Sequence, residues 1–159
     1  MRVCGVELKG GEAIISLLAY DAGNFNLPDC RTRMYPIAKL IDTEALTGFH
    51  FAFKKLMEDY HVDEVVIIQR DLKGKNAGSS ASFKAESAIQ LCGLPVALMH
   101  SSEMKERLKL NPIQANLEDL ELKKFQYPAF RVAYAHHHQI MYGPLKDDTD
   151  EEFEGEDQA

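Results

Sequence analysis

The chain of 159 residues lacks tryptophan, and its three cysteines are far apart and form no C-x-x-C pair. A paired-cysteine zinc site and a thiol redox motif are therefore excluded, and we interpret the cysteines as reduced thiols. No apolar run approaches the roughly 18 residues that a membrane helix needs. The N-terminal residues do not have the layout of a signal peptide. We expect a cytoplasmic protein with no membrane partner.

Several catalytic and nucleotide-binding motifs are also missing. No G-x-S-x-G occurs, and no alternation of aromatic and basic residues suggests base stacking. Gly74 and Gly78 are too close for a P-loop, and Ser79 stands where that loop requires lysine. The three histidines 136–138 cannot all bind one ion, because successive helical residues point about 100° apart. We expect them at a helix end, facing its C-terminal dipole.

The net charge of −7 comes from one end of the chain. Residues 146–159 contain eight acids and one lysine, so the remainder has equal numbers of acidic and basic residues. We therefore predict a folded domain over 1–145 and a disordered acidic tail over 146–159. The tail either solubilises the protein or mimics nucleic-acid charge and covers a basic patch. A neutral body argues against strong non-specific DNA binding.

Hydrophobic periodicity predicts five strands and several helices. The expected strands cover about 2–9, 12–20, 30–37, 62–70 and 94–99. The expected helices cover about 43–60, 82–92, 101–110, 117–125 and 129–140. Asp42 or Thr43 is expected to cap the first helix, and Ser101 or Ser102 the third. Pro128 interrupts the chain before the last helix. The β-β-β-α-β-α-β-α order, with further helical segments, predicts an α/β fold whose mixed five-stranded sheet has helices on both faces.

Two stretches carry candidate functional residues. Glu7 lies on the first strand, just before the Gly10–Gly11 turn, and is the candidate metal ligand. A basic, glycine-containing loop follows the apolar strand and precedes a helix, an arrangement that suits anions. The candidate catalytic residues are Glu7, Gln69 and Asp71. We predict that nucleic acid contacts Lys9, Arg70, Lys73, Lys75 and Asn76. A solvated polar loop without a ligand is the alternative.

Two stretches resemble the ribonuclease H-like superfamily. One is the first strand, with Glu7 ahead of a glycine turn, and the other is the apolar strand that leads to Lys75–Asn76 and a helix. Within this superfamily, the chain is most similar to the Holliday-junction resolvase RuvC. More narrowly, it resembles a small bacterial family known only as a domain of unknown function. These resemblances imply a ribonuclease H-like fold. The narrower family supplies a fold but no known activity.

The resemblance to RuvC also implies a two-metal nuclease, whose hard ions need several converging carboxylates. That family takes one from the first strand, one from the fourth and two from the start of the last helix. Here Glu7 holds the first position, Gln69 holds the second, and neither Phe130 nor Ala133, near the last two, is acidic. Asp71 shares the face of Gln69 if the strand continues that far.

Three hypotheses follow from these departures. The first is a catalytically inactive module that binds nucleic acid or a protein partner and needs no cofactor. The alternative is a divalent-metal-dependent nuclease with a rearranged carboxylate set, which would use Mg²⁺ or Mn²⁺. Acids that could then join Glu7 are Asp71, Glu118, Asp119 and Glu121. The third is a structural homodimer.

Overall fold

The computed structural model describes residues 1–75 and 77–146. Asn76 and nearly all of the predicted acidic tail, residues 147–159, lie outside the described residues. The strands are β1 (Arg2–Lys9), β2 (Glu12–Asp21), β3 (Asn24–Asn26), β4 (Met34–Pro36), β5 (Glu64–Ile68) and β6 (Val96–Met99). The helices are α1 (Thr43–Asp59), α2 (Ser80–Gln90), α3 (Ser101–Leu110) and α4 (Tyr127–Tyr142), with 3₁₀ turns η1 (Leu117–Asp119) and η2 (Lys124–Gln126).

One mixed sheet organises the chain, with the strand order β3-β2-β1-β5-β6. Strand β1 is central: it pairs antiparallel with β2 and parallel with β5, which in turn pairs parallel with β6. The ten residues of β2 are long enough to pair with β3 near one end and with β4 near the other. These two short strands therefore share one edge of the sheet.

The predicted strand over 30–37 is wrong in its bounds. Met34–Pro36 within this range forms β4, and β3 (Asn24–Asn26) lies before it, so the described residues form a six-stranded sheet where five strands were expected. Between them lies Pro28, which has no amide hydrogen to give to a ladder. The mixed sheet itself is confirmed, because β1 pairs antiparallel with β2 and parallel with β5.

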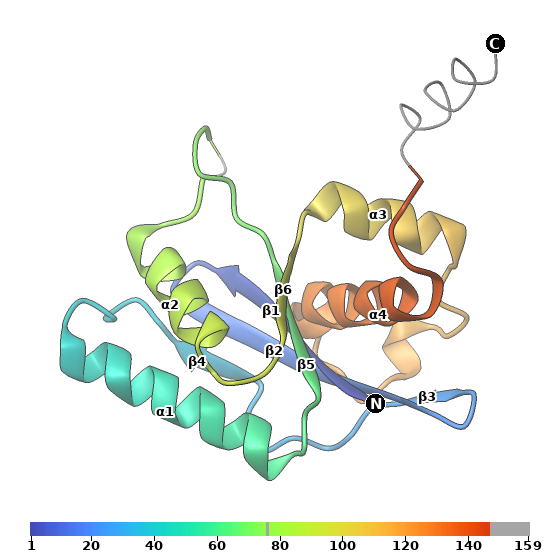
Figure 1. Ribbon diagram of the computed structural model, residues 1–159, viewed down its shortest axis with the longest axis horizontal. Coiled ribbons are helices and arrows are strands. Elements are labelled where there is room, and N and C mark those ends of the chain that lie inside the picture. The colour runs from blue at the N-terminus through green and yellow to red at the C-terminus, as the bar shows by residue number, and fades with distance from the viewer. Residues whose placement is uncertain (76, 147–159) are drawn as a thin grey trace, which may run out of the picture.

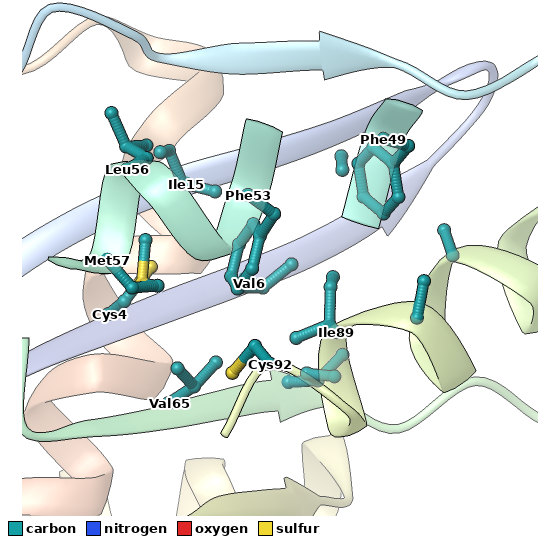
Figure 2. Close-up of a cluster of buried hydrophobic side chains, with 14 of the residues drawn as sticks. Cys4, Val6, Ile15, Phe49, Phe53, Leu56, Met57, Val65, Ile89 and Cys92 are labelled. Carbon is teal, nitrogen blue, oxygen red and sulfur yellow. The ribbon is translucent and has the colours of Figure 1, made fainter. Parts of the chain in front are cut away.

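Helices cover both faces of the sheet, as predicted. Helices α1 and α2 lie on one side, and α3 and α4 lie on the other (Figure 1). On the first side, Phe53 of α1 and Ile89 of α2 point toward Val6 of β1, and free thiols of Cys4 and Cys92 are buried among them (Figure 2). The buried residues on the second side include Val3, Val66, Met104, Phe130 and Val132. No helix in the described part of the chain is long and apolar enough to cross a membrane.

The residues that begin the helices agree only in part with those predicted from the sequence. The carboxylate of Asp42 accepts a hydrogen bond from the backbone of Ala45 at 2.8 Å, so the predicted cap of α1 is confirmed. Helix α3 is instead capped by His100, whose Nδ1 accepts from the Ser102 amide at 3.2 Å. Pro128 lies inside the first turn of α4, where its missing N–H is not needed.

The helix predicted over 117–125 is absent and is replaced by two 3₁₀ turns. The backbone becomes extended at Leu120, with φ −85° and ψ 151°, and this ends η1. Leu117, Leu120 and Leu122 all pack against the second core as a result. In a continuous helix the residues at positions 117, 120 and 122 would not all lie on the same face, so the three leucines could not all contact the core.

The expected position of the three histidines at a helix end is also wrong. Helix α4 continues to Tyr142, and all three histidine side chains are buried. Because they point in three directions, each contacts a different element. Their partners are the Glu64 carboxylate for His136 at 2.7 Å, the Leu18 carbonyl for His137 at 2.8 Å and the Arg107 guanidinium for His138 at 3.0 Å. Burial lowers the pKa of His137 and of His138. The histidines thus join α4 to β5, β2 and α3.

Helix α4 approaches the central strand most closely at Gly5. A Cβ atom at this position would overlap the carbonyl oxygen of Ala129 and lie 3.0 Å from the Cβ of Ala133. Both alanines are fully buried. The glycine therefore allows backbone-to-backbone packing that no other residue permits here, and it fixes the distance between α4 and β1.

We predict that Gly5→Ala lowers the free energy of unfolding by at least about 2 kcal/mol, because the new methyl group meets backbone that cannot rotate away. Urea unfolding followed by circular dichroism measures this change. The matched control is Gly48→Ala, on the exposed side of α1 with no atom within 4 Å of the added Cβ. That control should raise stability by up to about 1 kcal/mol through helix propensity. Equal effects of the two substitutions would contradict the close approach at Gly5.

Candidate functional site

A pocket of ≈ 350 Å³ opens where β1 and β5 end, and it is lined by all three candidate catalytic residues. Glu7 comes from β1, and Gln69 and Asp71 come from the segment after β5. The carboxyl ends of parallel strands meet at the same edge of a sheet, and this edge is where ligands of open α/β sheets commonly bind. The structure therefore brings together the residues that the sequence placed on separate elements.

The position beside Glu7 on the neighbouring strand is apolar. The parallel register pairs Val6 with Ile67, so Ile68 follows next to Glu7, and it packs against the core on the α3–α4 side. Strand β5 ends at Ile68, short of the predicted end at Arg70, so the condition under which Asp71 would share the face of Gln69 is not met. The backbone amide of Gln69 bonds to the Met99 carbonyl at 2.9 Å, and the chain then turns along the pocket.

Helix α4 contributes Pro128 and Arg131 to the pocket. The positions suggested by the resemblance, Phe130 and Ala133, are instead buried: Phe130 lies in the second core and Ala133 lies against Gly5. The pocket-facing pair is therefore two residues earlier, with the same spacing of three, and it is not acidic either. The apolar stripe of this helix includes Ala133, and that pattern was the available signal that this residue faces the core.

The residues present do not fit the two-ion site that the resemblance implies. Glu7 and Asp71 are the carboxylates among the residues that line the pocket. Within residues 1–75 and 77–146, no group of three or more His, Cys, Asp or Glu side chains is arranged to hold a metal ion. Asp119 and Glu121, considered as substitutes, line a different hollow. Hard divalent ions need more anionic oxygens than this pocket offers.

Opposite charges stand close together in and around the pocket. Burial raises the pKa of Glu7, while the charges of Lys9 and Arg70 act in the opposite direction. Asp71 has its Oδ1 3.5 Å from His100 Nε2. Arg131 lies with its guanidinium carbon 5.9 Å from the centre of the Tyr127 ring. The pocket wall thus combines two carboxylates with the two guanidinium groups of Arg70 and Arg131.

The basic loop between β5 and α2 projects from the end of β5 (Figure 1), and Arg70 and Asp71, near its start, line this pocket. Its two sides are joined by a bridge between Asp71 and Ala77, with the Gly78 amide bonded to the Asp71 carbonyl at 2.9 Å. Ser79 then caps α2 through the Ser82 amide. The base of the loop is therefore closed, and the exposed Lys73 and Lys75 lie between its two sides.

The predicted nucleic-acid contacts gather at this end of the sheet. Arg70 lines the pocket, whereas Lys9, Lys73 and Lys75 are exposed and lie outside its wall. Asn76 is not among the described residues. Prediction from sequence missed Arg131, Pro128, Ser101 and Met104, which complete the wall, and it missed His100, the partner of Asp71.

The chain has a ribonuclease H-like fold. The structure is similar to that of RuvC from Thermus thermophilus, with a TM-score of 0.69, 14% identity, and coverage of 90% of this chain and 97% of that one. A second structure, T. thermophilus RuvC in complex with Holliday junction substrate, gives the same TM-score and identity, with coverage of 90% and 96%. At this identity the likeness shows the fold, and the predicted fold class is confirmed.

Within that class, the chain belongs to the family described as "Protein of unknown function (DUF3010)", which matches residues 1–136. This result confirms the narrower resemblance to a domain of unknown function. A search among curated proteins found no match.

We predict that Glu7→Gln stabilises the protein at pH 7 and has less effect near pH 3. Because burial raises the Glu7 pKa above its ordinary 4.5, the folded state disfavours the charged carboxylate, and this cost grows as the pH rises through that range. Glutamine removes the cost, whereas at low pH both side chains are neutral. Denaturant unfolding at the two pH values, with Glu58→Gln on α1 as an exposed control, measures the difference. Destabilisation by Glu7→Gln at pH 7 alone would show that the nearby cations outweigh burial.

Proposed function

We propose that this protein is a catalytically inactive ribonuclease H-like module that binds nucleic acid at the pocket beside Glu7. One observation carries the proposal: where the resemblance to two-metal nucleases would place several carboxylates, the described lining of this pocket has Arg70 and Arg131 beside two acids, Glu7 and Asp71. Guanidinium groups bind phosphate oxygens directly and with fixed geometry. An anionic backbone can therefore be held by the chain's own cations, without divalent ions.

The surroundings of the pocket support the same role. Lys9, Lys73 and Lys75 are exposed at this end of the sheet, and each phosphate contact from such a residue adds affinity through counterion release. Asn76 belongs to the proposed contact set by its place in the sequence of the loop. RuvC, which shares the fold, has been solved with a Holliday junction substrate. Branched DNA is therefore the first nucleic acid to test.

Two other roles stay open to experiment. A metal-dependent nuclease is favoured by one observation, the presence of both Glu7 and Asp71 in the same pocket. A protein partner, including a second copy of this chain, would use the same exposed end of the sheet, and light scattering would detect a homodimer.

Free thiols are typical of a reducing compartment, so the proposal includes a cytoplasmic location.

We predict that the double variant Lys73→Glu/Lys75→Glu binds a four-way DNA junction at least about tenfold more weakly than the unchanged protein, because the loop then repels phosphate. Fluorescence anisotropy at several salt concentrations measures both the affinity and its salt dependence. The slope of log K against log salt should also become shallower, since fewer counterions are released.

The matched control is Lys54→Glu/Lys109→Glu, which makes the same charge change at exposed positions on α1 and α3, toward the opposite end of the sheet. This control should retain most of the affinity. Equal losses of DNA affinity in the two double variants would mean that the net charge of the protein, and not the loop, determines binding. No measurable binding of the unchanged protein to junction or duplex DNA would refute the nucleic-acid role.

A further inference from the structure

A second hollow, of ≈ 680 Å³, lies away from the pocket beside Glu7 and shares none of its lining residues. It is bounded by β2 and β3, by the segment 111–121 and by one side of α4 from Phe130 to Tyr142. We call it the α4–β3 groove. Its size is typical of a site that accepts a small molecule or a few side chains of a partner.

An aromatic cluster forms the floor of the α4–β3 groove. The Phe25 ring lies 4.7 Å from that of Tyr20, 5.1 Å from that of Tyr134 and 5.5 Å from that of His137, between centroids. Phe25 nevertheless stays 38% exposed, and Tyr142 at the rim is 68% exposed. Aromatic surface that is packed on one side and open on the other is typical of a recognition site.

The charge of the groove has one sign. Asp119 and Glu121 line it, both exposed, and none of its described lining residues is basic. Neither carboxylate forms an ion pair with another residue of the described ranges. The chain then continues, after the rim residue Tyr142, into the sequence with eight acids. This groove repels phosphate and attracts cations.

We propose that the α4–β3 groove binds a segment of a protein partner that presents an aromatic or large aliphatic side chain next to lysine or arginine. The apolar side chain would pack on Phe25 and Tyr134, and the cation would face Asp119 and Glu121. Exposed aromatic rings also attract cations through their faces. Charge complementarity excludes nucleic acid as the occupant. The proposal is independent of the function assigned to the pocket beside Glu7, because the two sites share no wall.

Selection of 12-residue peptides from a random displayed library against the full-length protein tests the proposal. We expect enrichment of peptides with an apolar or aromatic residue beside Lys or Arg. A synthetic peptide of the enriched sequence should bind at least about tenfold more weakly to Asp119→Lys/Glu121→Lys, because like charges then meet. Phe25→Ala should weaken binding as well, and circular dichroism checks that this variant folds.

Two controls separate this site from the rest of the molecule. Glu44→Lys/Glu58→Lys makes the same charge change at exposed positions on α1 and should leave peptide affinity unchanged. Glu7→Gln, in the other pocket, should also leave it unchanged. Acidic or uncharged consensus peptides, no enrichment, or equal affinity for Asp119→Lys/Glu121→Lys would each overturn the proposal. Enriched sequences that match this chain would identify a second copy as the occupant and would overturn it too.

Discussion

The contact between Gly5 and the backbone of Ala129 determines how the rest of the molecule is arranged. Because the central strand has no Cβ at this point, α4 lies directly on β1. The close packing buries Ala129 and Ala133 and sets the rotation of the helix about its axis. The first turn of α4 is thereby placed beside Glu7, with Pro128 and Arg131 in the pocket wall. The chemistry of the pocket depends on this packing.

This arrangement replaces one source of positive charge with another. Enzymes that clamp a phosphodiester with two divalent ions need converging carboxylates, and the ions then supply the positive charge. Here the wall holds two carboxylates together with Arg70 and Arg131, and the strand position beside Glu7 is Ile68. Fixed guanidinium groups can bind an anion but do not activate a water molecule as a metal ion does. The proposal of binding without cleavage rests on this set of side chains.

The sequence allowed much of this to be predicted, for identifiable reasons. Glu7 and Gln69 were candidates because the resemblance places catalytic acids at these positions, and Asp71 was a candidate substitute close to Gln69; all three line one pocket. Arg131 was missed because the rotation of a helix depends on the tertiary contact at Gly5. Strand β3 was not expected and β4 is shorter than the strand predicted over 30–37, because strand pairing depends on the partner strand. The burial of the three histidines of α4 was missed because it depends on the tertiary contacts of that helix.

Isothermal titration of the full-length protein with Mn²⁺, beside the Glu7→Gln variant, tests the central claim most directly. If the pocket relies on its own cations, the unchanged protein should show only weak binding, with Kd above about 1 mM, and the variant should behave in the same way. Tight Mn²⁺ binding that Glu7→Gln abolishes would contradict this account, because it would mean that enough carboxylates gather around Glu7 to hold an ion.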